Sequence, residues 1–293
     1  MAGIRGMAGC RIRQEVRMNS TTKPVNALFA GNREVKRLAG LLAFIIGTHT
    51  AMALAADFDR KEFVRDVGHA RQLAAQGKQS EGIAYWEKLR PRYGGAQGQY
   101  ENALGELYSN AKMYDKAEKT YLEGIALQGK FPNLYTGLAF VYLHTDRPSE
   151  AEKWAKRATS EFPKWWQGYY TLGEIARKGD RPQDAKVWLK KSVEVEPQPV
   201  TYWLMAMVAY DLKDYQSVVS SMEQAINRDK QYLGDQYGMK ASAISLARLG
   251  RYKDAYRAVE ILKKNNPKVT QAETQAIIDD VKTIEQSGAA KKS

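Results

Sequence analysis

Hydrophobic and polar positions along most of the chain follow the spacing of amphipathic helices. Apolar and small residues recur three and four positions apart, and no segment outside them shows the two-residue alternation of a half-buried strand. From about residue 100 onward, the same arrangement returns at intervals close to 34 residues. A helical pattern that repeats at this interval predicts pairs of antiparallel helices stacked in an array, with almost no strand.

The repeat is clearest at small residues and prolines. Ala117, Ala151 and Ala185 are each 34 residues apart, and Pro163 and Pro197 have the same separation. The alanines are expected where two helices approach closely. The prolines are expected to stop the second helix of each pair, because proline lacks an N–H and clashes inside a helix.

Large side chains between the small ones are expected to fill the space between helices. They are Tyr108, Tyr121, Tyr142, Leu189 and Met222. Two further copies, at residues 202–225 and 243–267, fit the period less closely, and residues 77–86 are a degenerate first copy. One helix pair cannot bury its apolar face alone, so stability is expected to come from stacking on neighbours.

Residue type and spacing together resemble the tetratricopeptide repeat, whose consensus is W-x₂-L-G-x₂-Y, then A-x₃-F, then P. One copy reads Tyr135-x₂-Leu138-Ala139-x₂-Tyr142, followed by Ala151, Ala158 and Pro163. The next reads Tyr169-x₂-Leu172-Gly173, followed by Ala185 and Pro197. The resemblance covers about residues 58–268. It implies an all-α, right-handed α-solenoid of about six helix-turn-helix units.

A further helix is predicted after the last repeat. Thr270 and Glu273 have the spacing of a capping box. They open an amphipathic segment with Ala276, Ile277, Val281 and Ile284 on one side. We expect this helix to cap the last unit, and residues 287–293 to form a frayed tail.

The N-terminal segment has the three parts of a secretory signal. Lys36 and Arg37 precede about ten apolar residues, and Ala53 and Ala55 supply small residues in A-x-A spacing. We therefore expect export to the periplasm, with cleavage near Ala55. The alternative is an uncleaved membrane anchor, although a spanning helix needs about 20 apolar residues. Met18 is an alternative start.

This gives three segments: an N-terminal extension with the signal at residues 1–56, the repeat array at 57–268, and the capping helix with its tail at 269–293. A hydrophobic fraction of 44% permits a packed core. The net charge of +12 includes eight basic and two acidic residues in the first segment, and the remaining surplus is dispersed. A dispersed surplus argues against nucleic-acid binding.

Residues that carry chemistry are sparse. Cys10, the only cysteine, precedes the expected cleavage site, so the mature chain would have no disulfide and no thiolate. His69 and His144 lie 75 residues apart, and neither has a second metal ligand at a suitable spacing. The chain also lacks the common nucleotide-binding and hydrolase motifs. We expect no catalytic residue, no metal site and no cofactor.

The family resemblance also implies a binding site. In that family, the first helices of stacked units line a concave groove that binds extended peptides or partner helices. Projecting the repeat onto this sequence gives the groove candidates Asn102, Glu106, Phe140, His144, Tyr170, Glu174, Arg177, Lys178, Trp203, Met207, Tyr210, Asp211, Lys240 and Arg248. For each of them, packing against the adjacent repeat is the alternative.

Trp203, Met207 and Tyr210 share one helix face, because they are spaced i, i+4 and i+7. We expect them to form the centre of the groove. Some family members grip a C-terminal peptide with a clamp of lysines, asparagines and an arginine. The equivalent positions here mix Glu106, Phe140, Tyr170 and Lys240, which do not reproduce that clamp.

The leading hypothesis is therefore a non-catalytic, protein-binding scaffold or adaptor of the bacterial cell envelope. It would bind a protein or peptide partner, with membrane contact only if the signal is not cleaved. A membrane-tethered subunit of a secretion or exopolysaccharide export machine is the alternative. An envelope hydrolase would need a catalytic glutamate in a separate compact domain, for which the repeats leave no room.

Overall fold

The protein is described by a computed structural model that covers residues 59–94, 98–127 and 130–290. The predicted secretory signal and its predicted cleavage site fall outside these residues. All the described helices belong to one compact unit, Phe58–Ser293. Within the described ranges the chain is helical and contains no strand, which confirms the all-α prediction.

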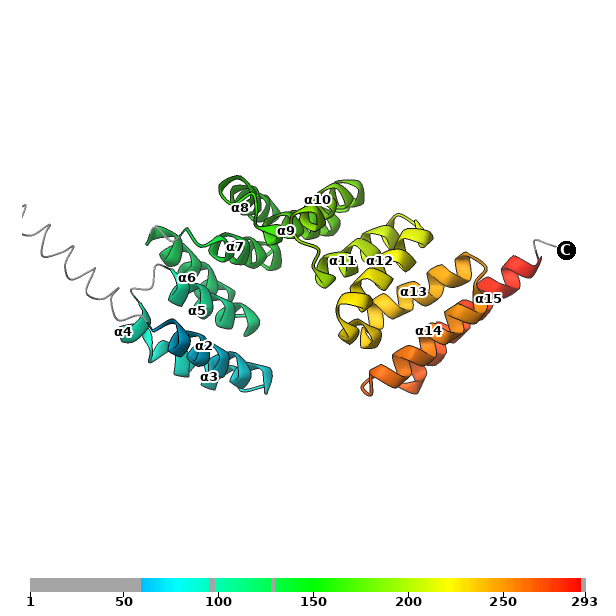
Figure 1. Ribbon diagram of the computed structural model, residues 1–293, viewed down its shortest axis with the longest axis horizontal. Coiled ribbons are helices and arrows are strands. Elements are labelled where there is room, and N and C mark those ends of the chain that lie inside the picture. Colours follow the sequence, from blue (N-terminus) through cyan, green and yellow to red (C-terminus); the bar gives the residue numbers. More distant parts are fainter. Residues whose placement is uncertain (1–58, 95–97, 128–129, 291–293) are drawn as a thin grey trace, which may run out of the picture. The chain divides into compact units, whose positions relative to one another are not determined.

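Six helical hairpins follow one another along the chain, each stacked on the next (Figure 1), which confirms the predicted array. The pairs are α2 (Arg60–Ala75) with α3 (Gln79–Glu87), α5 (Gln99–Asn110) with α6 (Tyr114–Ala126), α7 (Pro132–His144) with α8 (Pro148–Glu161), α9 (Trp166–Lys178) with α10 (Pro182–Val195), α11 (Pro199–Asp211) with α12 (Tyr215–Arg228), and α13 (Gln236–Arg248) with α14 (Tyr252–Asn265).

Three shorter or terminal elements complete the unit. They are α4 (Arg90–Tyr93), the 3₁₀ helix η2 (Lys230–Gly234) and α15 (Gln271–Ala290). Proline follows the second helix of three hairpins at Pro163, Pro197 and Pro267, each two residues beyond the helix end. The prolines therefore lie where the sequence predicted the helices to stop.

The turn inside each hairpin has one residue in the left-handed backbone region. These residues are Gly77, Lys112, Asp146, Asp180, Lys213 and Gly250, with φ between 53° and 84°. In each turn the next backbone N–H donates to a carbonyl five residues earlier, at 2.9–3.0 Å. This is the hydrogen bond of a Schellman motif, which satisfies a carbonyl at the helix end. All six hairpins close in this way.

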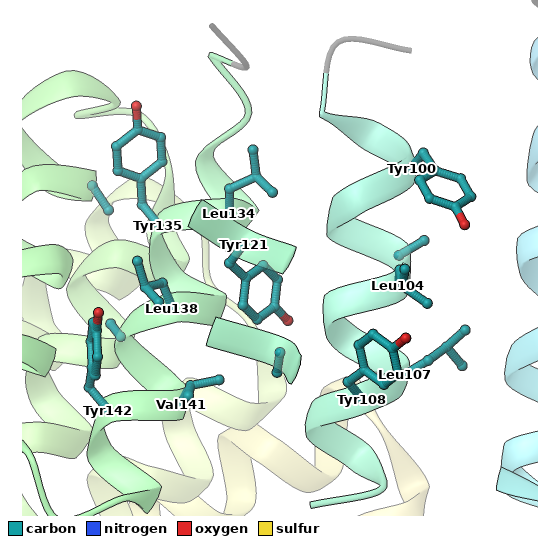
Figure 2. Close-up of a cluster of buried hydrophobic side chains, with 14 of the residues drawn as sticks. Tyr100, Leu104, Leu107, Tyr108, Tyr121, Leu134, Tyr135, Leu138, Val141 and Tyr142 are labelled. Carbon is teal, nitrogen blue, oxygen red and sulfur yellow. The ribbon is translucent and has the colours of Figure 1, made fainter. Parts of the chain in front are cut away.

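Small residues allow the helices to approach closely. Ala117, Ala151 and Ala185 are fully buried on the second helices, as predicted, and so is Ala255. The ring of Tyr121 reaches both Gly105 of α5 and Gly137 of α7: a Cβ added to either glycine would lie within 2.6 Å of the ring. Figure 2 shows this tyrosine among the buried side chains of α5 and α7. Glycine is therefore required at both positions by packing rather than by φ.

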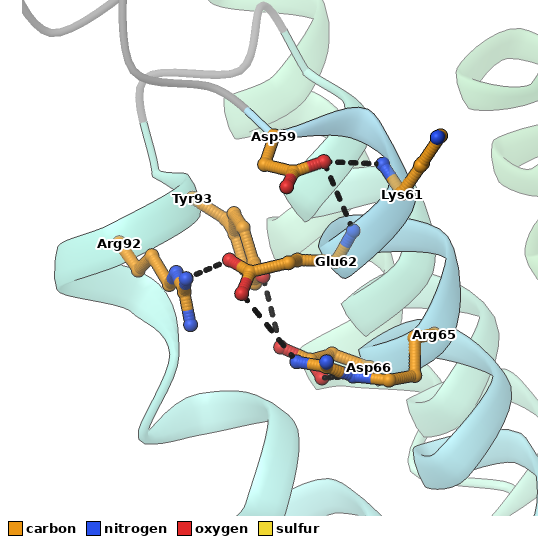
Figure 3. A network of polar contacts seen from close by, with 7 residues as sticks. All are labelled: Asp59, Lys61, Glu62, Arg65, Asp66, Arg92 and Tyr93. Carbon is orange, nitrogen blue, oxygen red and sulfur yellow. Dashed lines mark hydrogen bonds and ion pairs between the residues drawn. The ribbon is translucent and has the colours of Figure 1, made fainter.

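The start of the unit is fixed by polar contacts to α2, as Figure 3 shows. Asp59 caps this helix by accepting hydrogen bonds from the backbone N–H groups of Lys61 at 2.8 Å and Glu62 at 3.3 Å. Asp66, which is only 4% exposed, accepts a 2.8 Å hydrogen bond from the hydroxyl of Tyr93. Burial raises the pKa of Asp66, but hydrogen bonds from Tyr93 and Arg65 outweigh it, so the pKa is lowered overall. The short helix α4 is thereby tied to α2.

The last helix, α15, begins with the predicted capping box. The Thr270 hydroxyl accepts from the N–H of Glu273 at 3.2 Å, and the Glu273 carboxylate accepts from the N–H of Thr270 at 2.8 Å. Ile277 and Val281 are buried, as expected. Ala276 was placed on the wrong face and is exposed, because neighbouring residues are rotated by about 100° around a helix. The helix also continues to Ala290, through part of the expected tail.

No helix in the described part of the chain is both long enough and apolar enough to cross a membrane.

Candidate functional site

First helices of successive hairpins line an open cavity of about 600 Å³. It is formed mainly by α5, α7 and α9, with one residue each from α2, α6 and α11. The lining residues are Arg71, Asn102, Glu106, Tyr121, Asn133, Thr136, Gly137, Phe140, Trp166, Gln167, Tyr170, Thr171, Glu174 and Val200. The cavity is thus a product of stacking, because no single hairpin supplies its walls.

The lining follows the repeat. Asn102, Thr136 and Tyr170 occupy equivalent positions 34 residues apart on α5, α7 and α9. Glu106, Phe140 and Glu174 form a second set with the same spacing. Asn133 and Gln167 form a third and are the second residues of α7 and α9. The hairpins keep the geometry constant while the residue types vary, so the walls are chemically mixed.

Three carboxamides in the lining lack partners. Asn102 is only 8% exposed, and its side chain makes no hydrogen bond to another described residue. Asn133 Oδ1 and Gln167 Oε1 are buried and have no hydrogen-bond partner among the described residues. A buried polar group without a partner is costly and needs an explanation. A bound molecule that supplies the missing partners is one such explanation.

The two carboxylates of the lining differ in their partners. Glu106 forms an ion pair with Arg71 across α5 and α2. Glu174 is partly buried and forms no ion pair with a described residue. Burial raises the pKa of Glu174, and the positive charges of Lys178, His144 and Arg177 only partly oppose this. Burial also raises the pKa of Tyr170, with a further contribution from the negative charge of Glu174.

The structure brings five of the predicted groove residues together in this cavity: Asn102, Glu106, Phe140, Tyr170 and Glu174. His144 is exposed at the end of α7. Its ring is stacked on that of Phe140, with 3.9 Å between the ring centroids. Arg177 forms an ion pair with Asp211 at 2.6 Å, and Lys178 is exposed. Whether any of these residues contacts a partner stays a prediction.

The remaining candidates lie outside the cavity lining. Met207 is 7% exposed and belongs to a hydrophobic cluster of α9 to α13. Trp203 is partly buried against the same cluster and donates its indole N–H to Asp235 at 2.7 Å. Tyr210 is also partly buried there. These contacts agree with the packing alternative, in which the side chains join adjacent repeats.

The last two candidates are on α13. Lys240 pairs with Asp280 of α15 at 3.5 Å, with both side chains about half exposed. Arg248 is exposed in the last turn of the helix.

Several lining residues were not among the sequence-based candidates: Arg71, Asn133, Thr136, Trp166 and Gln167. Asn133 and Gln167 carried a usable signal, because they are carboxamides 34 residues apart at the start of first helices. The sequence contains no such signal for Arg71, because this residue lies before the repeats whose pattern is clear.

The described residues contain no group of three or more histidine, cysteine, aspartate or glutamate side chains that could hold a metal ion. His69 is exposed on α2, with its ring edge-on to Tyr85 at 4.7 Å. His144 bonds through Nδ1 to the carbonyl of Phe140 at 2.9 Å.

Two segments of the sequence, residues 97–131 and 167–199, match the tetratricopeptide-repeat family. The first contains α5 and α6, and the second contains nearly all of α9 and the whole of α10. The described chain is an α-solenoid of helical hairpins, and two of its hairpins match the tetratricopeptide repeat. The matched segments are the two hairpins that supply Asn102, Glu106, Gln167 and Glu174 to the cavity.

Several solved structures resemble this solenoid. PilW, a widely conserved type IV pilus biogenesis factor, matches with a TM-score of 0.60 and 16% identity over 75% of this chain and 100% of PilW. PilF of Pseudomonas aeruginosa matches with a TM-score of 0.57 and 16% identity over 74% of this chain and 96% of PilF.

A third match is a chain of the APC/C hetero-tetramer Cut9–Hcn1, with a TM-score of 0.60 and 13% identity. It covers 74% of this chain but only 42% of that one. Identities this low establish the fold alone. No curated protein matches the sequence.

Proposed function

We propose that this protein is a non-catalytic scaffold of the bacterial cell envelope that binds an extended peptide segment of a partner in the cavity of α2 to α11. The observation that supports it is the set of unpartnered carboxamides of Asn102, Asn133 and Gln167. A carboxamide offers both a donor and an acceptor, and so does each peptide group of an extended chain. The two are therefore complementary.

The length of the cavity suits an extended peptide. Packed helices lie about 8–10 Å apart, so the path from α5 over α7 to α9 is about 20 Å long. An extended chain covers this distance with about six residues.

The envelope location rests on the N-terminal sequence. A basic flank, a short apolar run and Ala53 and Ala55 in A-x-A spacing support export and cleavage. The test is mass spectrometry of the N-terminus after cell fractionation, with a periplasmic protein that begins near Ala56 as the expected result. An intact N-terminus in the membrane fraction would instead support the tethered alternative.

Peptide binding can be tested with the purified full-length protein. A random peptide library displayed on phage is expected to yield sequences that bind, as measured by fluorescence anisotropy. Thr136 lines the cavity, so Thr136→Trp should fill it and weaken binding at least tenfold. Val187→Trp is the matched control, because Val187 is 56% exposed on α10 and outside the lining.

Circular dichroism must show both variants folded. Equal binding by the wild type and a folded Thr136→Trp variant would place the site outside the cavity. A library that yields no binder would argue against a peptide scaffold altogether.

A further inference from the structure

We infer that the carboxylate of Glu174 receives an arginine side chain of the bound peptide; this rests on the proposed function. The inference gives the partner segment a chemical requirement: one arginine held between the repeats of α7 and α11.

The first step is the position of Glu174 within the repeat. Equivalent positions on successive first helices are Arg71, Glu106, Phe140, Glu174 and Met207. The first two neutralise one another through their ion pair. Glu174 instead lies between Phe140 and Met207, so neither neighbouring repeat places an opposite charge at the equivalent position.

The second step concerns the nearest cations. Lys178 lies one turn after Glu174 on α9 and is exposed. Arg177 is held by Asp211 at 2.6 Å, and the ring of His144 is stacked on Phe140. All three act on Glu174 through their charge, but none forms an ion pair with it. The carboxylate therefore remains available to a cation that enters the cavity.

The third step selects arginine over lysine. The cavity wall includes the aromatic side chains of Phe140, Trp166 and Tyr170. A guanidinium group stacks on aromatic faces and donates two parallel hydrogen bonds to a carboxylate. An ammonium group can satisfy the charge but has neither the planar face nor the fork.

The probes are decapeptides of alanine and serine that differ at one central residue: arginine, lysine, citrulline or leucine. Citrulline has nearly the shape of arginine without the charge, so it isolates the ion pair. Affinity for the full-length protein is measured by isothermal titration calorimetry. The arginine peptide is expected to bind about 10- to 100-fold more tightly than the citrulline peptide, with lysine between them.

Glu174→Gln should abolish the preference for arginine over citrulline. Glu223→Gln is the matched control, because Glu223 is exposed on α12 and makes no ion pair with a described residue. Lys178→Ala should leave the preference intact or increase it, since it removes a competing charge. An unchanged preference in Glu174→Gln, or equal binding of the arginine and citrulline peptides, would overturn the inference.

Failure of this inference can be told apart from failure of the proposed function. Peptides that bind in a Thr136→Trp-sensitive way but without preference for arginine would overturn only the assignment to Glu174. If none of the peptides binds and the phage library also yields no binder, both fail. A dimer in sedimentation that the arginine peptide dissociates would assign the cavity to a second copy of the chain and overturn the inference.

Discussion

The left-handed turn residues offer a direct test of how the hairpins are stabilised. Four of the six turns place a residue other than glycine at this position, and two of these are the exposed lysines Lys112 and Lys213. Neither lysine makes an ion pair or a side-chain hydrogen bond with a described residue. Replacing both with glycine should therefore relieve backbone strain and remove no contact.

The expected gain follows from two opposing terms. A side chain in the left-handed region costs about 1–2 kcal/mol. Against this gain, glycine lowers the free energy of unfolding by about 0.5–1 kcal/mol, because it has more conformational freedom than lysine in the unfolded chain. The net stabilisation is about 0.5–1 kcal/mol per site. For a chain of this size, the double variant Lys112→Gly/Lys213→Gly should melt about 2–8 °C higher than the wild type.

Thermal unfolding followed by circular dichroism at 222 nm, the helix signal, measures the effect. Asp146→Gly and Asp180→Gly should gain less, because aspartate tolerates the left-handed region better than lysine does. Glu223→Gly, in the interior of α12, is the control and should lower the melting temperature, since glycine in a helix costs about 1 kcal/mol. If the lysine-to-glycine variants melt lower, as this control should, the strain argument is wrong.

Three further predictions concern stability. Ala151→Trp or Ala185→Trp should overpack a fully buried helix contact and destabilise the fold by about 1–3 kcal/mol; an unchanged melting temperature would contradict the packing described for these alanines. Glu101 is 2% exposed, and burial raises the pKa of its carboxyl group above the ordinary 4.5. The folded state therefore favours the protonated side chain, and the free energy of unfolding falls as the pH rises through the raised pKa. Glu101→Gln should therefore raise the melting temperature at pH 8 but not at pH 4, and an equal effect at both would refute the assignment. Trp203→Phe should cost about 1 kcal/mol by removing the donor to Asp235, as chemical denaturation can measure.

The sequence predicted the fold well, because the residues that define a hairpin are also the residues that repeat. Alanines at helix contacts and prolines after helix ends are short-range signals with a fixed period. The left-handed turn positions were not predicted. They are occupied by glycine, lysine or aspartate, so backbone geometry repeats there while residue type does not.

The candidate site was predicted in part. Left-handed turn residues are 34 apart from Lys112 to Asp180, 33 apart up to Lys213, and 37 apart up to Gly250. The last interval contains the 3₁₀ helix η2. The predicted positions nevertheless keep their register, since Trp203 and Met207 are equivalent to Tyr170 and Glu174. Burial of Trp203 and Met207 depends on contacts between repeats, which residue type alone does not specify.

Packing confined to neighbouring hairpins has a consequence for how the chain folds. Each helix contacts mainly the helices just before and after it in sequence. The loops that must close to form these contacts are short, so the entropic cost of closure is small. Proteins with such local contacts fold in microseconds to milliseconds, and a stacked array can start at any pair of adjacent hairpins. Folding of this solenoid should therefore lack a single obligatory nucleus, and an N-terminal portion can acquire its structure before the last helices have left the ribosome.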